Sequence, residues 1–270
     1  MPDRVSAVPA RRDSVQSLER ALDLLEALAA GGDLGVTELA NRTGLVPSTA
    51  HRLLHTLVIR GWVTQSATGR YLLGYKVAEV GSGVGQRLER LRAVARPHLE
   101  SIQRATGETV NLVVVDGGRV VYVDQVEGTR NVRMFTAVGT TVPAHTTGAG
   151  KAIMAHWAPG AVAAMYGPHE PFEQLTPRTL LSVAALNDDF VRIRRRGYAI
   201  DNEEHEVGVG CVAAPVFDHT GRPAAAISVS GPSARILQAD PAALGALVVD
   251  RAREVSEALG HRATAVAERA

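Results

Sequence analysis

The stretch LVPSTAHRLLHTLVIRGWVTQSATGRYLL, residues 45–73, decides the fold of the N-terminal part of this chain. It predicts a helix over 47–59, because Pro47 suits the first turn of a helix and Gly61 suits the position beyond its end. Two runs of strand-forming residues follow at 62–65 and 70–73. The short link between them predicts that they pair as a hairpin.

The sequence before this stretch predicts two more helices. From Ser14 onward, apolar residues recur at the three- and four-residue spacing of one buried helix face. The residues of this face are Val15, Leu18, Leu22, Leu25 and Ala29. A short helix over 37–43 follows, with Thr37 as its cap and Gly44 after its end. Three helices and a hairpin within about 60 residues predict a winged helix-turn-helix over 14–74.

The distribution of charge indicates what this domain binds. The whole chain has 29 basic and 28 acidic residues and a net charge of +1, which alone argues against nucleic-acid binding. Residues 39–78, however, contain five basic residues and no Asp or Glu, which leaves a net charge of −4 on the rest. The five are Arg42, Arg52, Arg60, Arg70 and Lys76. The sequence therefore predicts binding of double-stranded DNA, and a protein-binding winged helix is the alternative.

The helix over 47–59 divides into two faces. Its apolar stripe consists of Ala50, Leu53, Leu54 and Leu57. Ser48, Arg52 and His55 lie opposite, flanked by Thr49, His51 and Thr56. We expect Ser48, Thr49 and Arg52 to read base edges in the major groove, with His55 on the same DNA-facing side. The predicted phosphate contacts are Arg42, Arg70 and Lys76.

Length and composition limit the class of protein. A chain of 270 residues with 46% hydrophobic residues suits two globular domains. Its single cysteine excludes an internal disulfide and a multi-cysteine zinc site. Residues 1–13 have no apolar core of a secretory signal, and no apolar run approaches the length of a membrane span. We therefore expect a cytoplasmic protein without membrane association.

The C-terminal part predicts an α+β domain around an antiparallel sheet. Strands are expected at 109–116, 119–125, 132–136, 198–201, 210–218 and 223–230. Helices are expected at 148–157, 180–196 and 241–259, and the second of these helices could also start near 176. The predicted organisation is a disordered arm at 1–13, the winged domain at 14–74, a linker helix at 75–96, the α+β domain at 97–262 and a tail at 263–270. Gly81, Gly83 and Gly85 predict a break or bend in the linker helix. Whether that helix pairs with a partner chain or is merely solvated stays open.

Several motifs in order resemble one protein family over essentially the full length of the chain. The N-terminal motifs are VTELA at 36–40, GLVPSTAHRLL at 44–54 and GRYLLG at 69–74. The C-terminal motifs are TGAGKA at 147–152, GYAIDNEEH at 197–205, GVGCVAAPV at 208–216 and ISVSGP at 227–232. Together they are similar to the IclR-type transcriptional regulators. The resemblance implies a GAF-like effector-binding domain, a homodimer or a dimer of dimers, a palindromic operator and a small organic acid as effector. Repression is the commoner outcome in similar proteins.

The resemblance also implies an effector pocket. Its residues would be Met134, Gly148, Ala149, Asp201, Val209, Cys211, Ser228 and Ser230. Gly148 and Ala149 open a helix whose free N–H groups suit a carboxylate. Ser228 and Ser230 share one side of a strand and add hydroxyl donors, while Met134 and Val209 supply apolar walls. Asp201 would repel a carboxylate, but its oxygens can accept hydrogen bonds from a ligand hydroxyl or orient a water.

Other interpretations of the same residues are weaker. A phosphate-binding loop around Gly148–Lys151 would need glycine at 145 and Ser or Thr at 152, where His145 and Ala152 stand. Cys211 with His205 or His145 could form a nucleophile and base, but Cys211 alternates with Val209 and Ala213 as one face of a strand does. Glu203, Glu204, His205 and Cys211 match no tight metal-ligand spacing. We therefore predict no catalytic residue, metal or cofactor. An enzyme or metabolite-binding protein with an accessory winged helix is the alternative function.

Overall fold

The computed structural model describes residues 15–134, 137–238 and 240–262. These form two compact units that divide between Arg87 and Leu88. The division falls inside one helix, α4 (Tyr75–Thr106), which contains the predicted linker. The predicted arm at 1–13 and tail at 263–270 lie outside the described residues, and the predicted domain boundaries remain a prediction.

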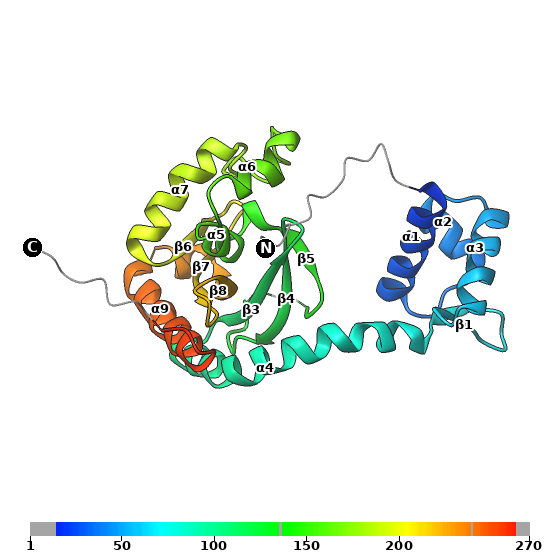
Figure 1. Cartoon of the computed structure of the whole chain (residues 1–270), viewed down its shortest axis with the longest axis horizontal. Helices are drawn as coiled ribbons and strands as arrows, with labels where there is room; N and C mark the ends of the chain where they lie inside the picture. The colour runs from blue at the N-terminus through cyan, green and yellow to red at the C-terminus, as the bar shows by residue number, and fades with distance from the viewer. Residues whose placement is uncertain (1–14, 135–136, 239, 263–270) are drawn as a thin grey trace, which may run out of the picture. The chain divides into compact units, whose positions relative to one another are not determined.

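The N-terminal unit contains three helices and a two-stranded antiparallel hairpin (Figure 1). The elements are α1 (Gln16–Gly31), α2 (Val36–Thr43), α3 (Pro47–Ile59), β1 (Val63–Gln65) and β2 (Tyr71–Leu73). Pro47 occupies the first turn of α3, as predicted, and Gly44 ends α2 with a φ of 65°. Leu34 adds a single bridge to Tyr71, which ties the α1–α2 connection to the hairpin. The winged helix-turn-helix is thus confirmed.

Two details of the first helices differ from the prediction. The buried row of α1 is Leu24 and Leu28, whereas Val15, Leu18 and Leu22 are 62%, 59% and 49% exposed. Leu25 is half-buried, Ala29 is exposed and Thr37 lies inside α2, which begins at Val36. Both rows of α1 satisfy the helical period, so the packing of α2 and α3 decides which one is buried. The Glu38 carboxylate accepts a hydrogen bond from Gly35 N (2.7 Å) at the start of α2.

Helix α4 is continuous, so the first of the two predicted alternatives, a break at the glycines, is wrong, and the second, a bend, stays a prediction. It passes through Gly81, Gly83 and Gly85 without interruption, because each glycine lowers helix stability by only about 1 kcal/mol relative to alanine. Beyond Leu88 the helix is anchored by a buried row, which consists of Leu91, Ala95, Leu99 and Ile102. Packing of that row contributes more than the local propensity removes.

The C-terminal unit is built on a six-stranded antiparallel sheet in the order β5-β4-β3-β8-β7-β6. The strands are β3 (Thr109–Asp116), β4 (Arg119–Val126), β5 (Thr141–Pro143), β6 (Ala199–Asn202), β7 (Val209–Phe217) and β8 (Pro223–Pro232). The strand predicted at 132–136 is wrong for 132–134, and 135–136 lie outside the described residues. Val132 is 67% exposed, and β4 pairs with β5 instead. The predicted α+β class is confirmed.

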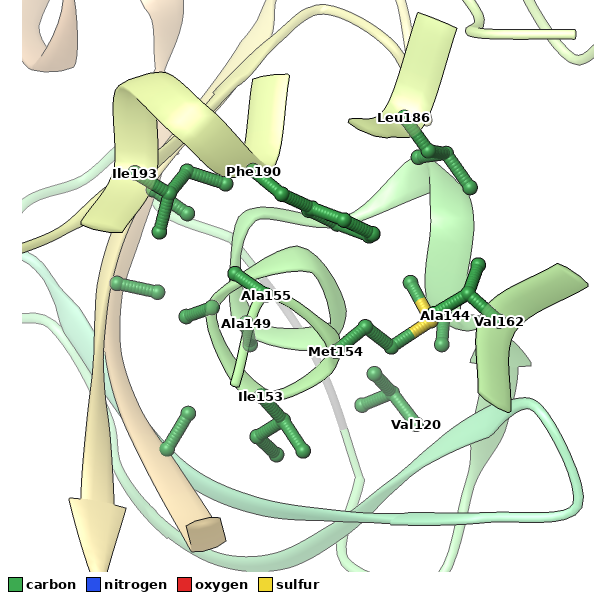
Figure 2. Packing of buried hydrophobic residues seen from close by; sticks show 14 of the residues in the cluster. Val120, Ala144, Ala149, Ile153, Met154, Ala155, Val162, Leu186, Phe190 and Ile193 are labelled. Atoms are coloured by element: carbon green, nitrogen blue, oxygen red, sulfur yellow. The ribbon is translucent and has the colours of Figure 1, made fainter. Parts of the chain in front are cut away.

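Helices cover both faces of this sheet (Figure 1). One face carries α5 (Gly148–Met154), α6 (Ala161–Tyr166) and α7 (Val183–Arg196), and the other carries the later part of α4 and α9 (Pro241–Ala258). Figure 2 shows α5 surrounded by apolar side chains, with Phe190 and Ile193 of α7 directed toward it. The remaining short elements are η2 (Ala144–Thr146), η3 (Gly167–His169) and α8 (Ser233–Ile236).

The helices of this unit also correct some predicted boundaries. Helix α7 begins at Val183 rather than at 176 or 180, because the Ser182 hydroxyl caps it by accepting from Ala185 N. Helix α5 ends at Met154, three residues before the predicted end, and α6 and α8 were not predicted. No helix in the described part of the chain is long and apolar enough to cross a membrane.

Candidate nucleic-acid interface and ligand site

The exposed face of α3 is the candidate nucleic-acid interface. Ala50 and Leu54 are fully buried beneath the helix, while Ser48, Arg52 and His55 are exposed and Thr49 is half-buried. This is the division of faces that the sequence predicts, and it places the candidate base-reading groups together. Within the described residues, Arg52 forms no ion pair. Its guanidinium is therefore free to bind a base edge or a phosphate.

The hairpin arginine is held by acidic groups that the charge count overlooked. Arg70 Nε lies 3.2 Å from Asp33 Oδ1, and its Nη2 lies 2.9 Å from Glu38 Oε2. Gly35 N–H, followed by the charge of Arg70, keeps the pKa of Glu38 below its usual value. Both acids stand just before residue 39, where the acid-free segment begins. The residues just before the acid-free segment therefore supply the acidic partners of Arg70 that a charge count of residues 39–78 leaves out.

Two of the predicted phosphate contacts, Arg70 and Lys76, are paired with carboxylates of the N-terminal unit. Lys76 Nζ lies 2.7 Å from Glu79 Oε1, one residue beyond the acid-free segment. Arg42 forms no ion pair in the described part of the chain and is exposed. Exposed pairs of this kind contribute about 0–1 kcal/mol, so a phosphate can displace the acidic partner. Among the described residues, the basic side chains near α3 that form no ion pair are Arg42, Arg52 and Arg60.

Strand register brings most of the predicted ligand site together on the α5 face of the sheet. Asp201 of β6 is opposite Cys211 of β7, which is opposite Ser230 of β8, which in turn is opposite Thr109 of β3. Ser228 lies in the next row, opposite Asn111. These six side chains are at least nine-tenths buried. They form a row of hydroxyl, amide, thiol and carboxyl groups inside an otherwise apolar core.

The first turn of α5 packs onto this polar row. A Cβ added to Gly148 would lie 3.2 Å from Asp201 N and 3.3 Å from Cys211 Sγ, so a larger residue would press against the sheet. Ala149 follows in the buried turn, and the Thr147 hydroxyl caps the helix by accepting from Gly150 N at 3.0 Å. The structure thus gathers Gly148 and Ala149 with the predicted strand residues.

Met134 and Val209 lie at the edges of this group. Met134 O accepts a hydrogen bond from the Thr109 hydroxyl at 2.9 Å, which holds the chain at 134 beside the polar row. Val209 begins β7 two residues before Cys211, is paired with Pro232, and is half-buried. That Met134 and Val209 form apolar walls of a ligand site stays a prediction.

Three polar residues of this region were missed in the sequence. Thr109 and Asn111 are fully buried on β3, and Tyr122 of β4 packs beside them against the same core. Thr109 and Asn111 alternate in the strand sequence TVNLVVVD, a pattern that marks one polar face in a valine-rich strand. That alternation could have identified them.

Burial determines the ionisation of the site. Burial, followed by the charge of Glu204, raises the pKa of Asp201 to about 7, against the hydrogen bonds that Asp201 accepts from backbone N–H groups and the charge of Lys151. Burial, followed by the charge of Asp201, raises the pKa of Cys211 to about 12. Burial, followed by the charges of Cys211 and Asp201, also raises the pKa of Tyr122. At neutral pH Cys211 and Tyr122 are therefore protonated, and Asp201 is divided between its protonated and ionised forms.

The protonated thiol argues against a nucleophilic role for Cys211. His205 Nδ1 is hydrogen-bonded to the Thr146 hydroxyl at 3.0 Å, and His145 Nε2 lies 3.3 Å from Glu173 O. Each imidazole therefore has a partner other than the thiol. Among the described residues, no three His, Cys, Asp or Glu side chains form a group that could hold a metal ion.

Comparison with known proteins covers both units. Residues 17–67 match the IclR helix-turn-helix domain, and residues 86–257 match the bacterial transcriptional regulator IclR C-terminal domain. The chain is 40% identical to the HTH-type transcriptional regulator BhcR of Paracoccus denitrificans over 92% of this chain and 88% of that one. It is 39% identical to the transcriptional repressor IclR of Escherichia coli over 95% of this chain and 94% of that one. A solved IclR homologue from Microbacterium hydrocarbonoxydans, complexed with 4-hydroxybenzoate, has the same fold with a TM-score of 0.74, 23% identity, and coverage of 90% and 98%.

Proposed function

Since this chain belongs to the IclR family of transcriptional regulators, we propose that it represses transcription by binding a palindromic operator, with an affinity set by a small organic acid. The observation that carries the proposal is the buried polar row beneath α5, in the same chain as an α3 face free of acidic side chains. The first feature suits a small polar ligand, and the second suits DNA.

In the proposed complex, α3 enters the major groove. Ser48, Thr49 and Arg52 contact base edges from its N-terminal half, and His55 faces the same groove. Arg42 binds a phosphate directly. Arg70 and Lys76 reach phosphates by exchanging their carboxylate partners, which costs little at exposed positions.

The proposed effector is a carboxylate bound between α5 and the sheet. Backbone N–H groups of Gly148 and Ala149 and the hydroxyls of Ser228 and Ser230 are its donors. Asp201 supports this assignment, because a carboxyl with a pKa of about 7 is protonated in about half of the molecules at neutral pH and can donate to the ligand. Cys211, Met134 and Val209 form the walls. The 4-hydroxybenzoate bound by the distant homologue is an acid of this class.

A homodimer, or a dimer of dimers, supplies two copies of α3 for the two halves of a palindrome. The exposed apolar row on α1 supports self-association through the DNA-binding unit. Val15, Leu18 and Leu22 are each about half exposed or more and follow helical spacing. An isologous contact would cover this row.

Fluorescence anisotropy with labelled DNA that flanks the chain's own coding region tests the proposal. We expect salt-dependent binding, and a change in affinity with one member of a panel of aliphatic and aromatic acids. Ser230→Leu should abolish the thermal shift caused by that acid and leave DNA binding without the acid unchanged. No DNA binding in the presence or absence of any acid would refute the regulator. An unchanged thermal shift in Ser230→Leu would refute the site.

A further inference from the structure

A buried charge cluster centred on Lys151 of α5 adjoins the proposed effector site. Lys151 is fully buried, with its Nζ 2.6 Å from Glu204 Oε1 and 2.9 Å from Asp189 Oδ2. The cluster joins α5, α7 and the loop after β6. Burial raises the pKa of Glu204 against the influence of Lys151. In Asp189 burial also acts to raise the pKa, but Lys151, Arg192 and Arg196 together lower it. A lysine held in this way is unavailable to the phosphate-loop chemistry that its Gly-Lys motif suggested.

A cleft of about 350 Å³ opens beside this cluster. Its polar lining consists of Asp189, Arg192, Arg196, Asn202 and Glu204. The apolar lining consists of Leu180 before α7, Ile200 of β6, Leu237 after α8 and Pro241 at the start of α9. None of the eight residues proposed for the effector site lines this cleft. The two sites are therefore distinct.

Glu204, which lines the cleft, has a buried hydrogen-bond acceptor. Glu204 is only 6% exposed, and its Oε2 has no hydrogen-bond partner among the described residues, although Oε1 is bonded to Lys151. An unpaired buried carboxylate oxygen costs about 1–3 kcal/mol or more, so a donor placed there is strongly favoured. A ligand hydroxyl or ammonium group is such a donor.

The α7 side of the cleft presents two guanidinium groups. Arg192 and Arg196 are one helical turn apart and therefore neighbours on the helix surface. Arg192 uses its Nε on Asp189 Oδ1 (3.2 Å), and Arg196 uses its Nε on Tyr198 O (2.6 Å). Within the described residues, their terminal nitrogens form no ion pair or hydrogen bond. Paired guanidinium nitrogens are the preferred partners of a carboxylate.

We propose that this cleft is a second ligand site, which binds a small 2-hydroxy- or 2-amino-carboxylate. The ligand's carboxylate lies on Arg192 and Arg196, and its hydroxyl or ammonium group donates to Glu204 Oε2. The charged groups at the cleft are the cations Arg192, Arg196 and Lys151 and the carboxylates of Asp189 and Glu204. They leave one net positive charge, which suits a monoanion or a zwitterion. Glu204 N–H also donates to Asp201 Oδ1 at 2.7 Å, so a ligand here adjoins the backbone that supports the effector site.

Isothermal titration calorimetry of the full chain with L-lactate, L-serine and propionate tests this assignment. Lactate and serine should bind, and propionate should bind at least about tenfold more weakly because it lacks a donor for Glu204, which corresponds to about 1.4 kcal/mol. The double variant Arg192→Gln, Arg196→Gln should lose the lactate and serine heats. Arg195→Gln changes an exposed arginine on the same helix outside the cleft and should keep them.

A second measurement separates this cleft from the effector site. Ser230→Leu should still bind lactate in the cleft, even though it fills the other site. The proposal would be overturned if Ser230→Leu lost lactate binding while the double arginine variant kept it. It would also be overturned if neither lactate nor serine gave any heat of binding with the wild-type chain. If thermal unfolding shows that the double variant is unstable, Arg196→Gln alone provides the same comparison. DNA binding is scored separately, so failure here leaves the proposed regulator intact.

Discussion

Replacing Asp201 with Asn should make the stability of the C-terminal unit less sensitive to a rise in pH from about 4 through about 7. Asp201 is 3% exposed, and its pKa is raised to about 7 mainly by burial, whereas an unfolded aspartate titrates near about 3.9. Between these values the folded chain holds a proton that the unfolded chain has released. Stability therefore falls as the pH rises from about 4 through about 7. The neutral amide of Asn keeps an oxygen that can accept from Glu204 N and removes this dependence.

The size of the effect follows from the two pKa values. Linkage gives a destabilisation of roughly 1.5 kcal/mol at about pH 5 and roughly 4 kcal/mol at about pH 8 for the wild-type carboxyl. The advantage of Asp201→Asn over wild type should therefore grow by about 2–3 kcal/mol between these pH values. Because both proteins share every other titrating group, the difference between them isolates Asp201.

Urea unfolding at the two pH values measures this difference. The chain has two tryptophans, so a Trp62→Phe background leaves Trp157 to report on the C-terminal unit. Asp188→Asn, an exposed aspartate on α7, is the control and should shift stability equally at both pH values. An advantage of Asp201→Asn that is the same at both values would refute the assignment of a buried, protonated Asp201.

Three further predictions concern other parts of the chain. Gly150→Ala should destabilise the C-terminal unit by about 1–3 kcal/mol in urea unfolding, because its Cβ would lie 2.2 Å from a backbone carbonyl oxygen. Gly81→Ala meets only open space and should stabilise α4 by up to about 1 kcal/mol, so equal effects of the two would contradict this reasoning. Lys151→Met should cost about 3–5 kcal/mol, measured the same way, because it leaves the buried carboxylate of Glu204 without its cation and Asp189 with Arg192 alone; a neutral result would show that Glu204 takes up a proton instead. In anisotropy titrations with DNA, Arg52→Ala should relax the preference for one sequence. Arg70→Ala should weaken binding to every sequence and reduce the slope of log affinity against log salt concentration by about one unit or less. The same uniform loss of affinity in both variants would contradict this division of roles.

Local patterns predicted the helices and strands whose limits are set by neighbouring residues. The bounds of α3 agree with the prediction because Pro47 and Gly61 act within one turn of the helix they limit. The hairpin of β3 and β4 agrees for the same reason, since Gly117 and Gly118 adopt the positive φ that its turn requires. The break predicted in α4 was wrong because packing of its later half overrides the weak propensity of glycine.

Contacts between distant segments could not be predicted in this way. The sequence showed two candidate rows on α1, and only its packing against α2 and α3 decides which is buried. The acid-free segment suggested free basic groups, but Asp33 and Glu38 reach Arg70 from 37 and 32 residues away. Lys151 pairs with Glu204 across 53 residues, and no local pattern predicts such a pair.

The sequence by itself determined the class of this protein: a winged helix-turn-helix with an acid-free recognition helix, and an α+β domain in which Ser228, Ser230 and Cys211 alternate toward one face. These are consequences of the 3.6-residue and two-residue periods of helices and strands, which any local stretch records. Tertiary structure alone decided that strand register places Asp201, Cys211, Ser230 and Thr109 in one row beneath α5. It also decided that burial raises the pKa of Asp201 in this row, because the removal of water from a carboxyl depends on every segment packed around it and not only on its neighbours in the chain.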